Sequence, residues 1–320
     1  MTEHLDPLMI CGTFASLMVA KRSGLLKSAL ERMSPPADHA QRLGLDARVA
    51  ESILDVLVAA GLVYKRGDLY GIPPDAPVIL RRSLGLVDAL NEDFSHTLRA
   101  LETGKPLEWL DNSLEERAER YQERVVWLAE LYAEVAGTLA ERLALQPARI
   151  LDVGCGAGVW SLAIAARTPG AHVTGLDLPG VVGSFQQHAA SLDLADRAEA
   201  LAGDMFSVPL PHGHFDLIVL ANVLRIEAPS NAERLVARLA ALLPPRGRIL
   251  IIDALAGGTT LKNLGRAAYA LHLGLRTKRG RVHSVEQITS WLRSAGLARV
   301  VPIDCELLPM AIGALLAERD

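Results

Sequence analysis

The stretch ILDVGCGAGVWSLAIAA, residues 150–166, decides the fold of this chain. It begins as an apolar β-rich run and ends as a helix, and Gly154, Gly156 and Gly158 connect the two. Glycine allows a tight turn and lets backbone N–H groups approach a ligand closely. The spacing is G-x-G-x-G, and Val159 stands where the dinucleotide fingerprint has its third glycine. The loop is therefore not expected to hold a pyrophosphate.

Acidic residues accompany this loop and the two strands that follow it. Asp152 precedes the loop, where a carboxylate repels a phosphate and suits a cationic amine. Asp177 ends the next strand, 23 residues after Gly154, where a carboxylate can accept from both hydroxyls of a ribose. Asp204 follows a further apolar stretch, and it suits the exocyclic amine of an adenine, with Met205 packed on the ring. Amine, ribose and adenine without phosphate together describe S-adenosylmethionine. The predicted cofactor-binding residues are Asp152, Gly154, Gly156, Gly158, Asp177, Leu178, Asp204, Met205 and Phe206.

Short apolar β-rich runs alternate with helical stretches from residue 149 onward. The predicted strands are 149–153, 172–177, 215–224 and 248–255, and the predicted helices are 158–168, 180–193, 231–243 and 285–295. This alternation is typical of βαβ units and a buried parallel sheet. Two late runs, 298–303 and 310–317, are predicted to form a closing antiparallel pair. The predicted fold class is therefore α/β, with a Rossmann-like sheet.

Composition excludes several classes of protein. The 320 residues suit two domains, and a net charge of −4 argues against a general nucleic-acid binder or a surface for anionic membranes. The three cysteines, Cys11, Cys155 and Cys305, lie far apart, so no disulfide framework is expected and a reducing cytoplasm fits. The apolar stretch 8–20 has 13 residues, fewer than the roughly 20 that span a bilayer. We expect it to form a buried helix, without membrane insertion.

The N-terminal part reads as a small helical domain. Residues 37–63 predict helix, turn and helix, with Gly61 ending the second helix, and 63–72 predict a two-stranded wing. This is a winged-helix pattern. Its second helix begins with a net acidic set of residues, Asp46, Arg48, Glu51 and Asp55, whereas phosphate contacts need Lys and Arg. The pattern therefore favours a dimerisation or lid domain over DNA binding. A helical connector follows, with a long amphipathic helix over 113–145.

Several segments together carry a resemblance to a known family, namely LGLDARVAESILDVLVAAGLV (43–63), DVGCGAG (152–158), GLDLP (175–179), GDMF (203–206) and GRVHSVEQITSWLRSAGL (280–297). The chain resembles the class I S-adenosylmethionine methyltransferases, and more closely the small-molecule O-methyltransferases with an N-terminal winged-helix dimerisation domain. The resemblance implies a seven-stranded sheet, a homodimer, and a substrate pocket between the sheet and the connector helices. It implies a dimerisation domain over 1–82, a connector over 83–146 and a catalytic domain over 147–320.

One departure from the family concerns the catalytic base. The family usually has Leu-His-Asp-Trp after the fourth strand, with the His as general base, whereas here 223–227 reads VLRIE and Arg225 takes the place of the His. A guanidinium stays protonated and has no acceptor, so it cannot abstract a proton. Arg225 can instead grip a substrate carboxylate, lower the pKa of a hydroxyl, or lie in a solvated loop. His272 and His96 are candidate substitutes for the base, and His283 replaces the Arg of the family's Arg-Thr pair.

The sequence leads to one principal expectation and one alternative. We expect a cytoplasmic, homodimeric methyltransferase that transfers a methyl group from S-adenosylmethionine to a small natural-product or pigment intermediate, at oxygen, nitrogen or carbon, and releases S-adenosylhomocysteine. The alternative is a non-methylating enzyme, catalysing cyclisation or hydroxylation, that uses the sulfonium as a fixed charge. No nucleic-acid partner is expected. No metal is expected either, because no neighbouring ligand completes the pair His212 and His214.

Overall fold

In the computed structural model the chain divides into two compact units, Met1–Ala89 and Leu90–Asp320. The structure describes residues 6–85, 87, 95–105, 113–255, 260–303 and 312–320. Each unit has a hydrophobic core of its own. None of the described helices combines the length and the apolar character that crossing a bilayer requires.

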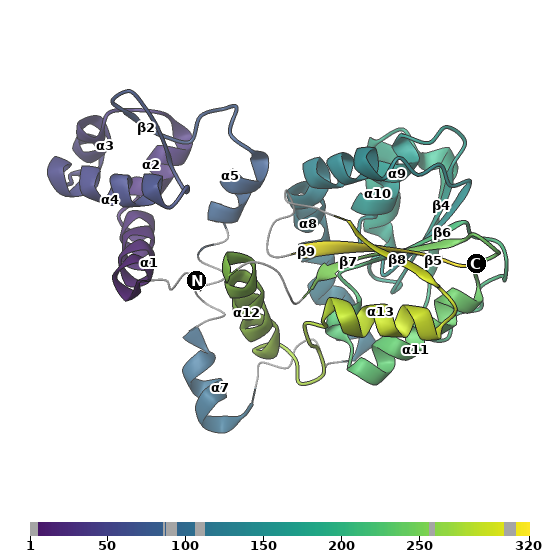
Figure 1. Ribbon diagram of the computed structural model, residues 1–320. Helices are drawn as coiled ribbons and strands as arrows, with labels where there is room; N and C mark the ends of the chain where they lie inside the picture. Colours follow the sequence, from purple (N-terminus) through teal and green to yellow (C-terminus); the bar gives the residue numbers. More distant parts are fainter. Residues whose placement is uncertain (1–5, 86, 88–94, 106–112, 256–259, 304–311) are drawn as a thin grey trace. The chain divides into compact units, whose positions relative to one another are not determined.

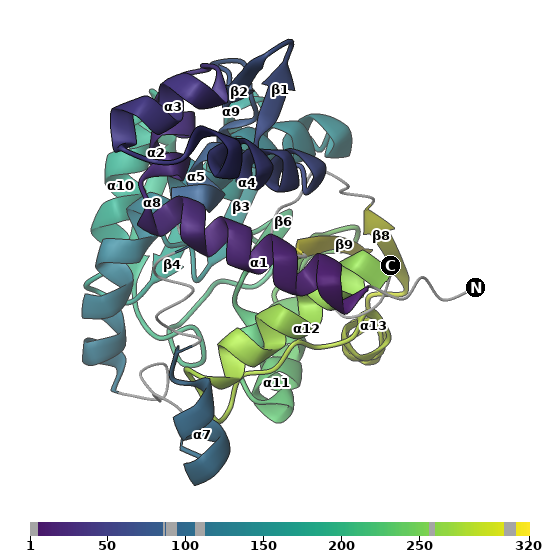
Figure 2. The same cartoon turned by 90° about the vertical axis from the view of Figure 1, so that its left-hand side faces the viewer.

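The first unit packs helices against a two-stranded wing (Figures 1 and 2). Its elements are α1 (Pro7–Arg22), α2 (Leu25–Glu31), α3 (Pro36–Leu43), α4 (Ala47–Ala59), β1 (Tyr64–Arg66), β2 (Leu69–Gly71) and α5 (Val78–Gly85). Asp46 begins α4, because its Oδ1 accepts from the N–H of Val49 at 2.9 Å. β1 and β2 pair antiparallel. The helix, turn, helix and wing predicted from the sequence are therefore present.

The first helix differs from its prediction in one respect. Residues 8–20 are helical, but Leu8, Met9 and Phe14 are 77%, 62% and 59% exposed. Only Ala20 of α1 is buried. The prediction of a buried helix is therefore wrong for the single chain, because apolar content shows that a helix needs a partner but not which chain supplies it.

The second unit is built on a sheet whose described strands follow the order β5-β4-β3-β6-β7-β9-β8. Their bounds are β3 (Arg149–Val153), β4 (His172–Asp177), β5 (Ala198–Ala202), β6 (Leu217–Ala221), β7 (Arg248–Ala254), β8 (Arg299–Ile303) and β9 (Ile312–Glu318). The first five strands in this order are parallel, whereas β9 runs antiparallel to β7 and β8. The predicted α/β class and the closing antiparallel pair are confirmed. Residues 310 and 311 of the last predicted strand lie outside the described residues.

Two strands differ from the sequence prediction. β5 was not predicted, because its sequence AEALA has no β-branched residue, and it lies at the edge of the sheet. β6 ends at Ala221, although the apolar run continues to Leu224. The chain leaves the sheet at Asn222, whose φ is +62°. Val223 and Leu224 then enter the core outside the sheet, which a hydrophobic pattern cannot distinguish from a continuing strand.

Helices cover both faces of this sheet. Figure 1 shows α9 (Val159–Ala166) and α10 (Val182–Ser191) on one face, and α11 (Pro229–Ala241) and α13 (Val285–Ser294) on the other. The other described helices of this unit are α7 (Thr97–Thr103), α8 (Leu114–Leu143), α12 (Thr260–Gly274) and the short η2 (Ala195–Arg197) and η3 (Leu224–Ile226). A capping box of Ser113 and Glu116 begins α8, which packs along α9. This packing places one face of α8 near the carboxyl ends of the central strands.

Candidate active site

A cavity of about 370 Å³ lies at the carboxyl ends of the central strands. Its walls are the loop 154–157, the ends of β4 and β6, the segment after β5, and one face of α8. The volume lies in the range of small-molecule and cofactor sites. In open parallel sheets ligands bind at this edge where the strand order reverses, which here is between β3 and β6.

The glycine loop turns as predicted, but its N–H groups are used inside the protein. Gly154 and Gly158 both have φ +67°, and a Cβ on Gly154 would lie 2.6 Å from Cγ2 of Val223. The N–H groups of Gly154 and Cys155 donate to the carbonyl of Leu176 at 2.8 and 3.1 Å, and that of Gly158 donates to the carbonyl of Cys155 at 2.6 Å. A phosphate cradle needs N–H groups that are free for the ligand. The loop therefore suits a cofactor without a pyrophosphate.

Asp177 is held by the backbone at the end of β4. Its Oδ2 accepts from the N–H of Gly156 at 2.8 Å, and its Oδ1 accepts from the N–H of Leu178 at 2.7 Å. Burial raises the pKa of Asp177, while the two N–H donors act to lower it. Each carboxylate oxygen keeps a further lone pair, and Asp177 and Leu178 both line the cavity. The carboxylate is thus fixed in place and able to accept from two neighbouring hydroxyls.

The GDMF segment lines the cavity next to Asp177. The N–H of Phe206 donates to Oδ1 of Asp204 at 3.0 Å, which fixes the turn after β5. Asp204, Met205 and Phe206 all face the cavity, and Arg234 of α11 places its guanidinium carbon 5.0 Å from the ring centre of Phe206. The structure therefore brings together the carboxylate and the apolar surface that were predicted for an adenine.

Asp152 lies beneath the glycine loop and does not line the cavity. It is 2% exposed on β3, and Oγ of Ser161 on α9 donates to its Oδ2 at 2.5 Å. Burial raises its pKa to about 7, while the bond from Ser161 acts to lower it. Among the described residues its buried Oδ1 has no hydrogen-bond partner. Asp152 thus points toward α9, and its contact with an amine stays a prediction.

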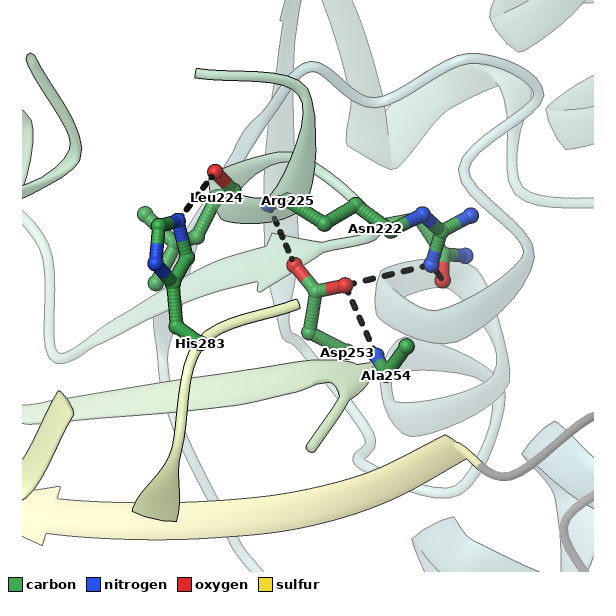
Figure 3. A network of polar contacts seen from close by, with 6 residues as sticks. All are labelled: Asn222, Leu224, Arg225, Asp253, Ala254 and His283. Atoms are coloured by element: carbon green, nitrogen blue, oxygen red, sulfur yellow. Dashed lines mark hydrogen bonds and ion pairs between the residues drawn. The ribbon is translucent and has the colours of Figure 1, made fainter. Parts of the chain in front are cut away.

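Arg225 belongs to a buried polar network, shown in Figure 3. Its side chain is 12% exposed, and its Nη1 donates to Oδ1 of Asp253 at 3.2 Å and to Oδ1 of Asn222. Its backbone N–H donates to Oδ2 of Asp253 at 3.2 Å, and the guanidinium carbon lies 5.0 Å from the ring centre of Tyr269. Burial opposes the charge, but the nearby tyrosines and Asp253 hold the pKa of Arg225 above its ordinary value. The solvated-loop interpretation is therefore wrong, and Arg225 is a fixed cation.

The histidines considered for catalysis lie away from the cavity wall. His272 is buried on α12, with its ring centre 6.1 Å from that of Tyr269, and His96 precedes α7. His283 forms a hydrogen bond from Nε2 to the carbonyl of Leu224 at 3.0 Å (Figure 3). Among the described residues, no histidine lines the cavity. A role for His272 or His96 as the base stays a prediction.

The pair His212 and His214 takes part in local contacts. Nδ1 of His212 lies 3.2 Å from the carbonyl oxygen of Ala241, and the ring of His214 packs edge-on against Phe215. The described residues contain no cluster of three or more His, Cys, Asp or Glu side chains that could hold a metal ion.

Several site residues were missed by the sequence analysis. Asn222 and Asp253 lie at the carboxyl ends of β6 and β7, so the rule that ligands bind beyond strand ends could have found them. Tyr121 and Tyr132 lie on the face of α8 that lines the cavity. An amphipathic helix gives no signal that separates a cavity-lining tyrosine from a core tyrosine, so only the fold could show these two.

The family of the chain follows from comparison with known proteins. The family model of an O-methyltransferase domain matches residues 114–298, which is more than half of the chain. The chain belongs to the O-methyltransferase family. The matched range contains every described residue of the cavity wall, from Leu114 on α8 to Arg279.

Known relatives of this O-methyltransferase extend over nearly its whole length. It is 26% identical over 298 residues to the 3-hydroxy-5-methyl-1-naphthoate 3-O-methyltransferase of Streptomyces sahachiroi, which covers 89% of this chain and 86% of that protein. The pyocyanin biosynthetic protein PhzM has a similar structure, with a TM-score of 0.74, 20% identity and 98% and 97% of the two chains covered. Human N-acetylserotonin methyltransferase in complex with S-adenosylmethionine gives a TM-score of 0.63, with 23% identity over 100% and 99% of the chains. At these identities the solved structures establish the fold.

Proposed function

We propose that this enzyme transfers a methyl group from S-adenosylmethionine to a hydroxyl oxygen of a small aromatic natural-product or pigment intermediate, and releases S-adenosylhomocysteine. Membership in the O-methyltransferase family supports oxygen as the acceptor atom. The single observation that supports this cofactor is the setting of Asp177. Two backbone N–H groups hold its carboxylate, and the neighbouring glycine loop uses N–H groups for hydrogen bonds within the protein. That combination fits a ribose and leaves no cradle for a phosphate.

The residues around Asp177 form the cofactor end of the cavity, defined here as the loop 154–158, Asp177 and the segment 204–206. We assign Asp177 and Leu178 to the ribose, the segment 204–206 to the adenine, and the loop with Asp152 to the methionine part. When bound, the sulfonium supplies an electrophilic methyl carbon. The chain's own contribution is to hold the two substrates in line and to exclude water from the reacting atoms.

The acceptor end is defined here as Asn222, which lines the cavity, together with Arg225, Asp253 and Tyr269, which are joined to it by contacts but are not part of the described cavity wall. We propose that methyl transfer there proceeds without a histidine base, and that Arg225, which occupies the position of the family's histidine in the sequence, does not act as a base. The described cavity wall, which contains no histidine, supports this proposal. Because the same feature also suits a non-methylating reaction, the products must be measured rather than the loss of substrate alone.

We further propose that the enzyme is a homodimer in which α1 takes part. The support is the row of exposed apolar side chains on this helix, including Leu8, Met9 and Phe14. Mass photometry of the wild type should give the dimer mass, and Phe14→Glu should shift it toward the monomer. The free thiols of Cys11 and Cys155 fit a reducing cytoplasm, which we propose as the location.

The test of the main proposal is a coupled measurement. Calorimetry should show S-adenosylhomocysteine binding to the wild-type enzyme. Incubation with methyl-labelled S-adenosylmethionine and a panel of hydroxylated naphthoates and hydroxynaphthoquinones should give S-adenosylhomocysteine and methyl ether in equal amounts with at least one acceptor. Product without S-adenosylhomocysteine would favour the non-methylating alternative. No binding of either cofactor form would refute the assignment of Asp177.

A further inference from the structure

The acceptor end presents one side chain whose donors are left for a ligand. Asn222 lines the cavity directly after β6, in a left-handed conformation with φ +62°. Its backbone N–H donates to the carbonyl of Ile252 at 2.7 Å. Its Oδ1 accepts from Nη1 of Arg225, and because arginine is only a donor, the amide oxygen must face Arg225. No described group accepts from Nδ2, so its two N–H donors remain for the contents of the cavity.

Arg225 fixes this orientation and strengthens the donors. The guanidinium stacks on Tyr269. It is also paired with Asp253, so it cannot swing away from Asn222 without breaking a buried ion pair (Figure 3). A cation on the amide oxygen polarises the group and makes its N–H donors stronger. Strong fixed donors favour an anionic oxygen over a neutral hydroxyl, because hydrogen bonds to a charged acceptor are about twice as strong as those between neutral groups.

The charged and titratable groups around this network come from several elements. Asp253 on β7 pairs with Arg225, Tyr269 on α12 stacks on it, and Tyr121 and Tyr132 on α8 act on it electrostatically. Burial raises the pKa of Tyr121 and Tyr132, so both stay neutral near pH 7. His272 packs on Tyr269, and Arg276 acts electrostatically on Tyr121. The phenols of Tyr121 and Tyr132 are therefore not bases near pH 7, and the carboxylate of Glu227 is the candidate base that the wall offers near this network.

Glu227 is the carboxylate of the wall nearest in sequence to this network. It is 4% exposed, and Nδ2 of Asn231 donates to its Oε2 at 3.1 Å. It follows η3, on the side of α11, and no hydrogen bond joins it to Asn222 or Arg225. A base role for Glu227 is therefore the rival that the experiment must separate.

We propose that Asn222 binds the acceptor oxygen through Nδ2, that Arg225 is its positioning residue, and that the enzyme takes hydroxyls already ionised near neutral pH, such as an enol or phenol conjugated to a carbonyl group. This inference rests on the proposed function. A lone pair of the ionised oxygen forms the new C–O bond while the C–S bond breaks and its electron pair stays on sulfur. The proton has already left to water, so no enzyme base is needed. An ordinary phenol, with a pKa of about 10, would arrive protonated and react poorly.

The test measures acceptor binding by absorbance, with S-adenosylhomocysteine saturating the enzyme. The acidic probe is 2-hydroxy-1,4-naphthoquinone and the ordinary phenol is 1-naphthol. We expect the bound quinone to show the spectrum of its anion, with its pKa lowered by about one unit, and 1-naphthol to bind about tenfold more weakly. A neutral bound quinone, or equal affinity for the two probes, would overturn the proposal.

Variants separate the roles of the individual residues. Asn222→Gly keeps a left-handed backbone and removes the donors, so it should weaken quinone binding about tenfold. The control Asp196→Asn changes an exposed residue of η2 outside the cavity and should change quinone affinity less than about twofold. Arg225→Gln should return the pKa of the bound quinone toward its free value, and Arg225→Lys should restore part of the shift. Unchanged quinone binding in Asn222→Gly would refute the assignment.

Two further readouts make each failure distinguishable. Glu227→Gln should leave the quinone bound as its anion. Loss of the anion in this variant would show that Glu227, and not Asn222, determines the ionised state of the bound acceptor. If the quinone binds in its neutral form while S-adenosylhomocysteine still binds, only this inference fails. If S-adenosylhomocysteine does not bind to the wild type at all, the proposed function fails, and the inference fails with it.

Discussion

The cofactor end and the acceptor end of the cavity are held together in different ways. At the cofactor end, backbone N–H groups hold the two carboxylates. Leu178 and Gly156 donate to Asp177, and Phe206 donates to Asp204. At the acceptor end, side chains hold one another, and Arg225 joins Asn222, Asp253 and Tyr269 from separate elements. The first arrangement needs β3 and β4 to pair, because Gly156 lies 21 residues before Asp177, whereas the second needs β6, β7 and α12 to assemble. We therefore expect loss of Asp253 to disturb folding, and loss of Asp177 to disturb binding.

The largest expected effect is on stability at the acceptor end. Asp253→Asn leaves the buried charge of Arg225 without a counter-ion, and it should lower the free energy of unfolding by about 4 kcal/mol. Urea unfolding followed by circular dichroism measures the change. The matched control is Glu318→Gln, which breaks the more exposed ion pair to Arg248 and should change stability little. Equal decreases in the free energy of unfolding of the two variants would show that the network around Arg225 contributes no more to stability than a surface ion pair.

The next effect tests the buried acid beneath the cofactor end. The pKa of Asp152 in the folded protein is about 7, above its ordinary value of 3.8, so folding retains a proton that the unfolded chain releases. This contribution to stability is complete below about pH 4 and is lost as the pH rises to about 7. Asp152→Asn mimics the protonated form, and it should be more stable than the wild type at pH 8 by up to about 4 kcal/mol. The two proteins should converge near pH 4, and a variant that is less stable at pH 8 would contradict the account.

A third effect should appear in binding while the fold is retained. Asp177→Ala removes an acceptor for two ribose hydroxyls, at about 1.5 kcal/mol for each bond, so S-adenosylhomocysteine should bind about 100-fold more weakly. Calorimetry measures the affinity, and the exposed Asp196→Asn serves as the control outside the cavity. An affinity within about threefold of the wild type would show that Asp177 does not bind the ribose.

The smallest effect concerns the rim of the cofactor end. Arg234→Ala removes the guanidinium that stacks on Phe206, and the loss of about 0.5 to 1 kcal/mol of cation–π energy should weaken S-adenosylhomocysteine binding two- to fivefold. Arg293→Ala, an exposed arginine on α13, should have no effect. A loss as large as that of Asp177→Ala would mean that Arg234 contacts the cofactor directly.

The same contrast explains what the sequence could predict. The strand, glycine loop and helix at 150–166, the acid that ends β4 and the GDMF turn are local patterns. Of the residues predicted from them to bind the cofactor, all line one cavity except Asp152 and Gly158. The substitution at Arg225 was visible, but its partners were not, because Asp253 lies 28 residues away and reaches Arg225 through sheet pairing. The exposure of α1 was missed because apolar content does not identify the partner surface.

Native mass spectrometry of the enzyme as purified, without added cofactor, tests the central claim most directly. The account predicts a dimer that carries S-adenosylhomocysteine in the wild type, and a protein without it in Asp177→Ala. Intact S-adenosylmethionine would support the cavity but leave the non-methylating reaction open to the product test. A wild-type protein that stays unliganded after either compound is added would contradict the account.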